Sequence, residues 1–279
     1  MTRQSQRPAR GFDKPSRRSF LNAAAGAGAV SLIAPSVLTA RSSNEMLNVA
    51  CVGVGGMAGG AGVRHVDTNQ HAQVVALCDV DATILARQSR SHPKAKTFSD
   101  YRRTLDVMDR DIDAVTIATP DHMHGPIALA AMDLGKSVYC EKPVAHNITE
   151  VRAMTMMAER KGVVTQLGTQ VHSSTQYRSA VAALREGAIG KVSEAHLWVN
   201  ASWSGPPKKR PNREDSVPDH LDWSLWLGVA PPRPFVDKLY LPYQWRRWKD
   251  FGGGTLGDMG CHLLDPLFAA LEINTVVSL

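Results

Sequence analysis

A glycine-rich turn between two apolar runs constrains the fold of this chain more than any other feature. The first run, residues 47–54, is apolar at most positions, which is typical of a strand buried on both faces of a parallel sheet. Gly53, Gly55 and Ala58 follow the spacing G-x-G-x-x-A. Here the first residue permits a tight turn, the second lets the backbone approach a pyrophosphate, and the third is small enough for a helix to pack on the strand. The spacing predicts a strand–turn–helix unit that opens a parallel α/β sheet.

The same turn predicts a dinucleotide site. Free N–H groups and the positive dipole at a helix start attract phosphates, and Gly56 and Met57 lie within this turn. A second apolar run, residues 74–78, ends in Asp79, a little further along the chain than the usual offset of about 20 residues. A carboxylate there would accept hydrogen bonds from the ribose hydroxyls of NAD and repel the 2′-phosphate of NADP. A purely structural glycine turn and an FAD site are the alternatives, and the strand, helix and acid together favour NAD.

Apolar periodicity divides the chain into three parts. Residues 46–170 alternate between strands and helices, which predicts a doubly wound, parallel Rossmann domain of five strands. After the glycine turn, strands are expected at 74–78, 114–118, 137–140 and 163–167, and helices at 82–91, 101–108, 126–134 and 148–161. Residues 171–279 are expected to form a second α/β domain, in which a helix at 176–186 precedes an alternating strand at 191–201 of a mixed or antiparallel sheet. Residues 1–45 precede both domains.

The first 45 residues resemble an export signal. Arg17 and Arg18 are followed by Phe-Leu and then by a mild apolar stretch at 23–38. This stretch is too short and too weakly apolar for a stable membrane span. A disordered basic tail is the alternative, but the arginine pair followed by the apolar stretch favours a twin-arginine signal. We therefore expect recognition by the twin-arginine export machinery, cleavage near Ala40, and a periplasmic or secreted location.

Charge and cysteine placement argue against several classes of protein. The formal net charge is +6, but most of the excess lies in residues 1–45, so the body of the chain has no broad basic surface for nucleic acid or anionic membranes. A local basic cluster at 208–213 is best explained as a solvated loop. Cys51, Cys78 and Cys140 lie in or at the ends of predicted strands, and no cysteine has zinc-type spacing. We expect neither a disulfide framework nor a metal site.

Polar residues follow the third predicted strand. In open parallel sheets, ligands gather at the carboxyl ends of the strands. Thr119 and Pro120 follow this strand, and His122 and His124 lie just beyond. Two histidines alone do not make a metal site. We therefore expect these four residues to contact the cofactor or to cap the next helix.

The fourth predicted strand leads directly into Glu141 and Lys142, which precede Pro143. A lysine at a strand's carboxyl end, in a partly desolvated cleft, can exchange protons with a substrate oxygen. A surface Glu–Lys pair beside a turn proline is equally compatible with this position alone. We expect Glu141 and Lys142 to border the cofactor.

The second part of the chain carries another candidate pair. All six tryptophans lie between residues 198 and 248, in or around a proline-rich stretch, which indicates an ordered loop. Aromatic faces suit sugar rings, although tryptophans that pack an irregular core are at least as good an explanation. Asp258 and His262 then follow a glycine run, at positions i and i+4 of a helix expected over 258–271. They share a face, and we favour a site there over an ordinary surface pair.

Together these motifs resemble the Gfo/Idh/MocA oxidoreductases, the family of glucose–fructose oxidoreductase and inositol dehydrogenase. The resemblance runs from residue 46 onward, and its most specific parts are Glu-Lys-Pro at 141–143 and D-x-G-x-H at 258–262. It implies NAD(P) binding by the first domain, His262 as general base on a sugar hydroxyl, Lys142 as the residue that orients this hydroxyl and relays its proton, and Asp258 as a substrate-positioning residue. It also implies a homo-oligomer formed through the second sheet. Family members usually continue further, so a C-terminally truncated, incomplete second domain is expected.

Three functions are compatible with these features. The first is an exported NAD-dependent oxidoreductase acting on a sugar, cyclitol or sugar derivative. The second is a glycoside hydrolase that oxidises its sugar transiently with tightly held NAD, so that no net NADH appears. The third is an inactive, truncated sugar-binding remnant. The presence of Lys142, Asp258 and His262 argues against an inactive remnant, whereas the early end of the chain argues for one. We expect the exported NAD-dependent oxidoreductase.

Overall fold

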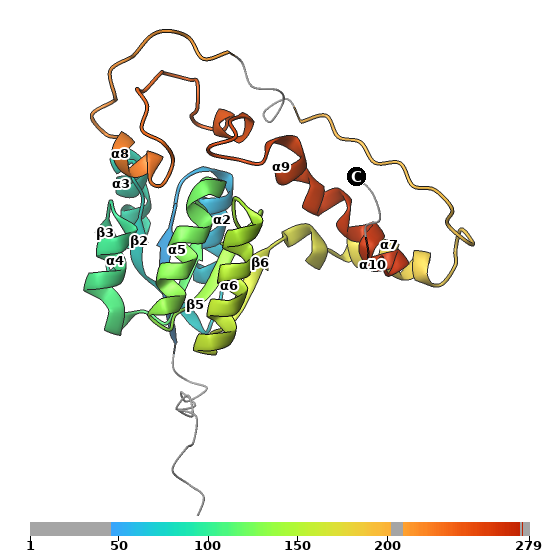
Figure 1. The fold of residues 1–279 in the computed structure, drawn as a ribbon. Coiled ribbons are helices and arrows are strands. Elements are labelled where there is room, and N and C mark those ends of the chain that lie inside the picture. Colours follow the sequence, from blue (N-terminus) through green and yellow to red (C-terminus); the bar gives the residue numbers. More distant parts are fainter. Residues whose placement is uncertain (1–45, 202–208, 274, 276–279) are drawn as a thin grey trace, which may run out of the picture. The chain divides into compact units, whose positions relative to one another are not determined.

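A six-stranded, fully parallel sheet forms the centre of the computed structural model, which describes residues 46–201, 209–273 and 275. Its strand order is β3-β2-β1-β4-β5-β6 (Figure 1). The strands are β1 (Leu47–Val52), β2 (Ala72–Cys78), β3 (Lys96–Phe98), β4 (Ala114–Ile117), β5 (Ser137–Glu141) and β6 (Thr165–Gly168). Because β1 pairs with both β2 and β4, the chain winds outward in two directions from β1. The predicted doubly wound parallel sheet is confirmed.

Five helices alternate with these strands. They are α2 (Gly56–Asp67), α3 (Ala82–Ser91), α4 (Tyr101–Met108), α5 (Asp121–Asp133) and α6 (Ile148–Lys161). Short polar side chains begin three of them: Asp81, Asp100 and Asn147 each accept a hydrogen bond from a backbone N–H in the first turn. Helix α5 begins at Asp121, earlier than the expected start near Pro126, and an acid in the first turn suits the positive end of a helix.

Helices cover the sheet on both faces. Helices α4, α5 and α6 pack on one face through a cluster that includes Leu105, Ile127 and Met154. Helices α2 and α3 pack on the other face through Val63 and Ile84. Strand β1 contributes alternate residues to the two clusters, which explains its nearly continuous apolar sequence. The one strand that the sequence did not predict, β3, has only three residues, too few for a periodic pattern.

The remaining described elements are helical. They are η1 (Asp109–Asp111), which follows α4, and η2 (Gln170–Ser173), α7 (Thr175–Arg185), α8 (Trp223–Leu227), η4 (Gln244–Arg247), α9 (Gly254–Leu263) and α10 (Asp265–Leu271). An aromatic cluster forms a second core here, built from Trp223, Trp226, Phe235, Tyr240, Trp245 and Phe251. These side chains are at most 8% exposed. For the tryptophans among them, core packing is therefore the correct explanation, and their faces are not open to a sugar ring.

The strand expected at 191–201 is not present in the structure. The described residues contain one sheet, and residues 192–201 pair with no other strand. Their side chains are mostly exposed, including 82% of Trp198, so alternation alone did not bury one face. A strand needs a neighbouring backbone for its hydrogen bonds, and the pattern of one segment does not reveal whether such a neighbour exists.

Several sequence predictions concern residues outside the described ranges. These are the twin-arginine signal, the start of the basic cluster at Lys208, and the last residues of the predicted second domain. Within the described ranges, no helix has the length and apolar character needed to cross a membrane. The helix expected over 258–271 is divided into α9 and α10, with Leu264 between them.

Candidate active site

The glycine turn after β1 is as tight as its spacing predicts. Gly53 has a φ of +77°, and a Cβ built on it would lie 2.8 Å from the backbone of Ala118 at the end of β4. Only glycine fits both restrictions. The close helix–strand contact lies at Gly59, where a Cβ would come 2.2 Å from the carbonyl oxygen of Gly53. The packing role that the spacing assigned to Ala58 therefore belongs to Gly59, one residue later.

The start of α2 has the character of an anion site. Gly55 is its N-cap, which has no side chain to accept a hydrogen bond from the first turn, and the first turn holds no acidic residue. Gly56 and Met57 are exposed, Met57 to 79%. The first turn of this twelve-residue helix is therefore exposed and lies at the positive end of the helix dipole, which suits a pyrophosphate.

Asp79 lies beside this turn, as predicted, and braces it. Its Oδ2 accepts hydrogen bonds from the backbone N–H groups of Val54 and Gly55, both at 3.0 Å. Its Oδ1 accepts from the N–H of Asp81, also at 3.0 Å. Burial raises the pKa of the Asp79 carboxyl, and these hydrogen bonds oppose the rise. The structure thus shows Asp79 supporting the phosphate loop, and its contact with a ribose stays a prediction.

Thr119 and Pro120 lie where the sequence placed them, at the carboxyl end of β4. The backbone nitrogen of Thr119 is 2.9 Å from the position that a Cβ on Gly53 would occupy. Thr119 Oγ1 is buried and has no hydrogen-bond partner among the described residues. A buried hydroxyl that lacks a partner beside a phosphate-binding turn, together with the open start of α2, fits a bound nucleotide that supplies polar groups here.

His122 and His124 have buried rings that contact backbone carbonyl oxygens, and the predicted contact with the cofactor or role as a helix cap stays a prediction. Each is 1% exposed. His122 Nε2 lies 3.2 Å from the carbonyl oxygens of both Trp226 and Leu227, and burial lowers the pKa of His122 to about 4. His124 lies 2.8 Å from the carbonyl oxygen of Thr119 through Nε2 and 2.7 Å from that of Pro143 through Nδ1. The His122 ring therefore connects the start of α5 to the backbone at 226–227. The His124 ring connects it to the backbone that follows β4 and β5.

Glu141 and Lys142 follow β5 into the same region. Glu141 is 7% exposed, and its Oε1 accepts a 2.6 Å hydrogen bond from Gln170 Nε2 in η2. A Cβ on Gly168, at the end of β6, would lie 2.9 Å from the Glu141 carboxyl group. The glutamate thus joins the ends of β5 and β6, and Lys142 extends beyond them.

The structure brings Lys142 and Asp258 together although they lie 116 residues apart. Lys142 Nζ donates to Asp258 Oδ1 at 2.6 Å and to the Asp258 carbonyl oxygen at 2.7 Å. The side chains are 15% and 7% exposed, so this is a buried ion pair. Arg246 Nε donates to the same Oδ1 at 3.1 Å, and its guanidinium lies 4.2 Å from the Trp245 ring centroid. Asp258 thus receives two cationic donors, and the surface-pair explanation of Lys142 is wrong.

His262 follows Asp258 by one turn of α9, as predicted. Burial lowers the pKa of His262, the positive charge of Lys142 lowers it further, and Asp258 and Asp265 oppose this. A histidine with a lowered pKa is neutral near pH 7 and can accept a proton. His262 Nδ1 is buried without a hydrogen-bond partner among the described residues. The group therefore combines a histidine that can accept a proton with a lysine that can donate a hydrogen bond.

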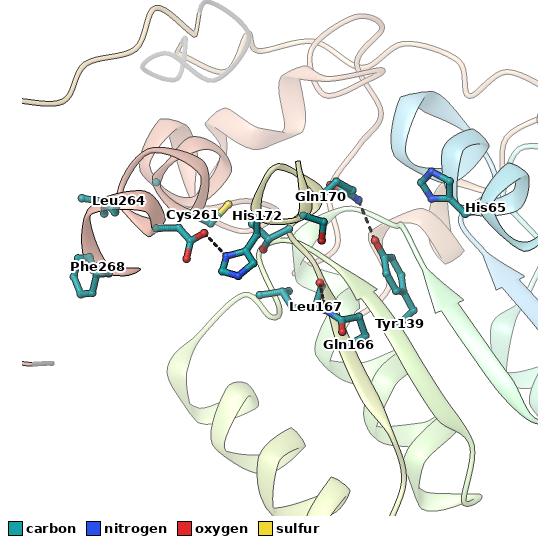
Figure 2. Close-up of a pocket in the computed structure, with 13 residues that line it drawn as sticks. His65, Tyr139, Gln166, Leu167, Gln170, His172, Cys261, Leu264 and Phe268 are labelled. Atoms are coloured by element: carbon teal, nitrogen blue, oxygen red, sulfur yellow. Dashed lines mark hydrogen bonds and ion pairs between the residues drawn. The ribbon is translucent and has the colours of Figure 1, made fainter. Parts of the chain in front are cut away.

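A cavity of about 850 Å³ lies next to this group (Figure 2). Lys142, Asp258 and His262 do not line it, but their neighbours Gly260 and Cys261 do. Its other side is built by residues after β6, including Gln170 and His172. The sequence analysis gave these two residues no role. Their position just past the carboxyl end of a strand could have indicated a ligand site, because ligands of parallel sheets gather there. It also missed Arg246, whose partner is identified only by the fold.

Comparison with known proteins agrees with this geometry. Residues 47–169 match the model of the Gfo/Idh/MocA oxidoreductase family for its NAD-binding Rossmann fold, and residues 188–276 match the model for its C-terminal alpha/beta domain. The two matches together cover well over half of the chain. The chain belongs to the Gfo/Idh/MocA oxidoreductase family. The family suggested by the glycine turn, Glu-Lys-Pro and D-x-G-x-H is thus confirmed.

Three individual proteins to which this chain is similar are 20–29% identical to it over the aligned residues. Levoglucosan dehydrogenase of Pseudarthrobacter phenanthrenivorans is 27% identical over 68% of this chain and 40% of its own length. A glycosyl hydrolase family 109 protein of Shewanella baltica is 29% identical over 60% of this chain and 36% of its own length. A gentamicin A biosynthesis protein crystallised with NAD shares the fold, with a TM-score of 0.57 and 20% identity over 82% of this chain and 55% of that one. The chain therefore spans well under two thirds of the length of these proteins.

Within the described ranges, no group of three or more histidine, cysteine or acidic side chains is arranged to hold a metal ion. Cys51, Cys78 and Cys140 are buried in strands as expected, and burial raises the pKa of each thiol, to about 11 for Cys51 and about 12 for the other two. A raised pKa keeps these three thiols protonated near pH 7, so they are poor nucleophiles.

Proposed function

We propose that this protein is an NAD-dependent oxidoreductase that acts on a hydroxyl group of a sugar, cyclitol or sugar derivative. The observation that carries the proposal is the buried Lys142–Asp258 ion pair, with His262 one helical turn away and the glycine turn at the same end of the sheet. Membership of an oxidoreductase family and similarity to levoglucosan dehydrogenase support the reaction class.

Each residue of this group has a distinct part in the proposed reaction. NAD, when bound, accepts a hydride from the carbinol carbon. His262, kept neutral by burial and by the charge of Lys142, accepts the hydroxyl proton. Lys142 donates a hydrogen bond to the hydroxyl oxygen and relays the proton, while Asp258 holds the Lys142 ammonium in place through two contacts. The products are a ketone, NADH and one proton, so charge and electrons balance.

The open start of α2, Gly53, Gly55, Thr119 and Asp79 would hold the cofactor. We propose that it is NAD rather than NADP, because the carboxylate of Asp79 lies at the end of β2 beside Gly55 and would repel a 2′-phosphate. Replacing Asp79 with alanine should weaken the preference for NADH over NADPH. Equal discrimination by the variant and the parent would show that another group reads the ribose.

The test begins with nicotinamide fluorescence as the full chain is titrated with NADH and with NADPH. Tight NADH binding, followed by reduction of NAD when sugars and cyclitols are added, is the expected result. A folded chain that binds neither nucleotide would overturn the cofactor assignment. A folded chain that binds NADH but reduces no NAD with any polyol would instead favour the sugar-binding remnant.

A second candidate function is glycoside cleavage through transient oxidation, favoured by the similarity to a glycosyl hydrolase family 109 protein. The same residues would oxidise the sugar, and NAD would be regenerated within each turnover. Released aglycone without net NADH would identify this reaction, whereas stoichiometric NADH would identify a dehydrogenase.

We further propose that the protein is exported in folded form by the twin-arginine machinery, which suits a protein that takes up its nucleotide in the cytoplasm. Arg17 and Arg18, followed by an apolar stretch, support this proposal. Replacing both arginines with lysine should retain the precursor in the cytoplasm, and export of the double variant at the parent level would contradict it.

A further inference from the structure

The cavity beside the proposed active site contains a histidine–carboxylate pair that the proposed reaction does not use. His172 Nδ1 lies 2.6 Å from Asp265 Oδ2, and both residues line the cavity (Figure 2). His172 lies in η2, just after β6, and Asp265 is the first residue of α10. The pair therefore joins the sheet edge to the helix that follows His262.

Two contacts fix the imidazole ring of His172. A carboxylate only accepts hydrogen bonds, so Nδ1 is the protonated nitrogen of the neutral ring and Nε2 carries the lone pair. The Tyr177 ring packs against His172, with ring centroids 4.7 Å apart. Burial, and then the Asp265 carboxylate, raise the pKa of Tyr177 to about 12, so this phenol stays neutral. The ring thus has a set orientation and a set tautomer.

The second nitrogen of His172 is available for a ligand. Among the described residues, no hydrogen bond to Nε2 is formed, and the His172 side chain is 57% exposed. Figure 2 shows its ring between Leu167 and the helical segment that carries Cys261 and Leu264. An imidazole held at one nitrogen and open at the other is a hydrogen-bond acceptor aimed by the protein.

The cavity lining indicates the kind of ligand that would meet this acceptor. Among the described residues that line it there is no lysine or arginine, so these residues offer no strong partner for a phosphate or a carboxylate. It supplies neutral polar groups instead, from Tyr139, Gln166, Thr169, Gln170 and Ser173. Leu167, Leu264 and Phe268 supply an apolar wall. An apolar wall beside neutral hydrogen-bonding groups suits a ring with C–H faces and hydroxyl edges.

Cys261 also lines the cavity but is not a plausible nucleophile here. Burial raises the pKa of its thiol, and the carboxylate of Asp258 contributes in the same direction, whereas Lys142 opposes the rise. A reactive cysteine needs the opposite shift. His172 is therefore not the base of a cysteine–histidine pair.

We propose that His172, oriented by Asp265, is a specificity-determining residue that accepts a hydrogen bond from a hydroxyl group of an uncharged sugar or cyclitol held in this cavity. The inference deepens the proposed function and rests on it for the reaction, but it concerns ligand binding. It can therefore be tested without turnover.

The experiment measures ligand binding to the NAD-loaded full chain by saturation-transfer NMR titration. The neutral probes are myo-inositol, D-glucose and levoglucosan, and the charged probes are D-glucuronate and D-glucose 6-phosphate. The test variant is His172→Phe, which keeps a flat ring on Tyr177 but removes both nitrogens. The matched control is His196→Phe, because His196 forms an exposed pair with Glu194 at 3.1 Å and does not line the cavity.

We expect at least one neutral probe to bind more tightly than both charged probes, and His172→Phe to weaken that binding roughly three- to tenfold, the effect of one lost hydrogen bond. Asp265→Ala should weaken it by a similar factor because the ring loses its orientation, and His196→Phe should leave it unchanged. Three results would overturn the inference: preference for a charged probe, unchanged neutral binding in His172→Phe, or no neutral binding by a folded chain. Failure of hydride transfer with the neutral-probe results intact would refute the proposed reaction alone.

Discussion

Protonation of the buried His122 should control the acid stability of this protein. His122 is 1% exposed and its pKa lies near 4, compared with 6.5 for a histidine in water. Between these two values the unfolded chain binds a proton that the folded chain rejects, so the free energy of unfolding falls as the pH falls below 6.5. The loss is complete near pH 4. At about 1.4 kcal/mol for each pKa unit, the whole effect is about 3 kcal/mol, of which about 2 kcal/mol falls between pH 7 and pH 5.

Urea unfolding of the full chain, followed by tryptophan fluorescence at pH 7 and pH 5, measures this effect. His122→Phe removes the titrating group and keeps a ring among Trp226 and Phe251. The variant loses the contacts to two carbonyl oxygens at both pH values, so it should be less stable than the parent at pH 7. Its stability should nevertheless change by about 2 kcal/mol less than that of the parent between the two pH values. His196→Phe, at an exposed histidine, is the control and should retain the parent's pH dependence. Equal pH dependence in the parent and His122→Phe would refute the reasoning.

Three other substitutions test separate parts of the structure. Gly59→Ala should destabilise the protein by about 1–3 kcal/mol and weaken NADH binding, because its Cβ would lie 2.2 Å from a backbone oxygen. Gly62→Ala is the control, because a Cβ at this position has no atom within 4 Å. In urea titrations this control should be neutral or stabilising by up to about 1 kcal/mol. Asp258→Ala should lower the free energy of unfolding by about 3–5 kcal/mol, because it leaves the buried cations of Lys142 and Arg246 unpaired. Asp106→Ala, which removes an exposed ion pair, should lower it by at most about 1 kcal/mol. Similar losses in the two variants would show that the buried ion pair stabilises the protein no more than an exposed one. Lys142→Ala should lower turnover of the identified substrate by a factor on the order of 10² or more with NADH binding retained, and near-normal turnover would exclude the proposed role.

The Rossmann part could be predicted from sequence because its signals are local. Buried parallel strands read as apolar runs, and four of the expected helices, 82–91, 101–108, 148–161 and 176–186, agree with the structure to within one residue at each end. The family could be predicted because Glu-Lys-Pro and D-x-G-x-H are short and specific. The strand expected at 191–201 failed for the opposite reason, because its existence depends on a partner that one segment does not encode.

The site was predicted less completely than the fold. Lys142 and Asp258 were both singled out, but only tertiary structure shows that they form one ion pair and that Arg246 joins them. His122 and His124 follow a strand end, which favours ligand contact, yet the direction of each ring depends on how α5 begins. At the glycine turn the spacing identified Ala58, whereas the path of α2 brings Gly59 to the strand.

The first turn of α5 has a consequence for how the chain folds. The His122 ring contacts the carbonyl oxygens of Trp226 and Leu227, which lie 104 and 105 positions later in the sequence. The backbone N–H of His122 donates to the carbonyl oxygen of Phe251, and Asp121 Oδ2 accepts a hydrogen bond from the N–H of Gly253. These partners are made much later during synthesis than α5 itself. The sheet and α5 can form from contacts within residues 46–168. The aromatic cluster is completed later, and its backbone then binds to His122 in the α5 that has already formed. Folding should therefore proceed by templating, with α5 as the surface on which the later segment assembles, and pulsed hydrogen exchange should protect the amides of α5 before those around Trp226.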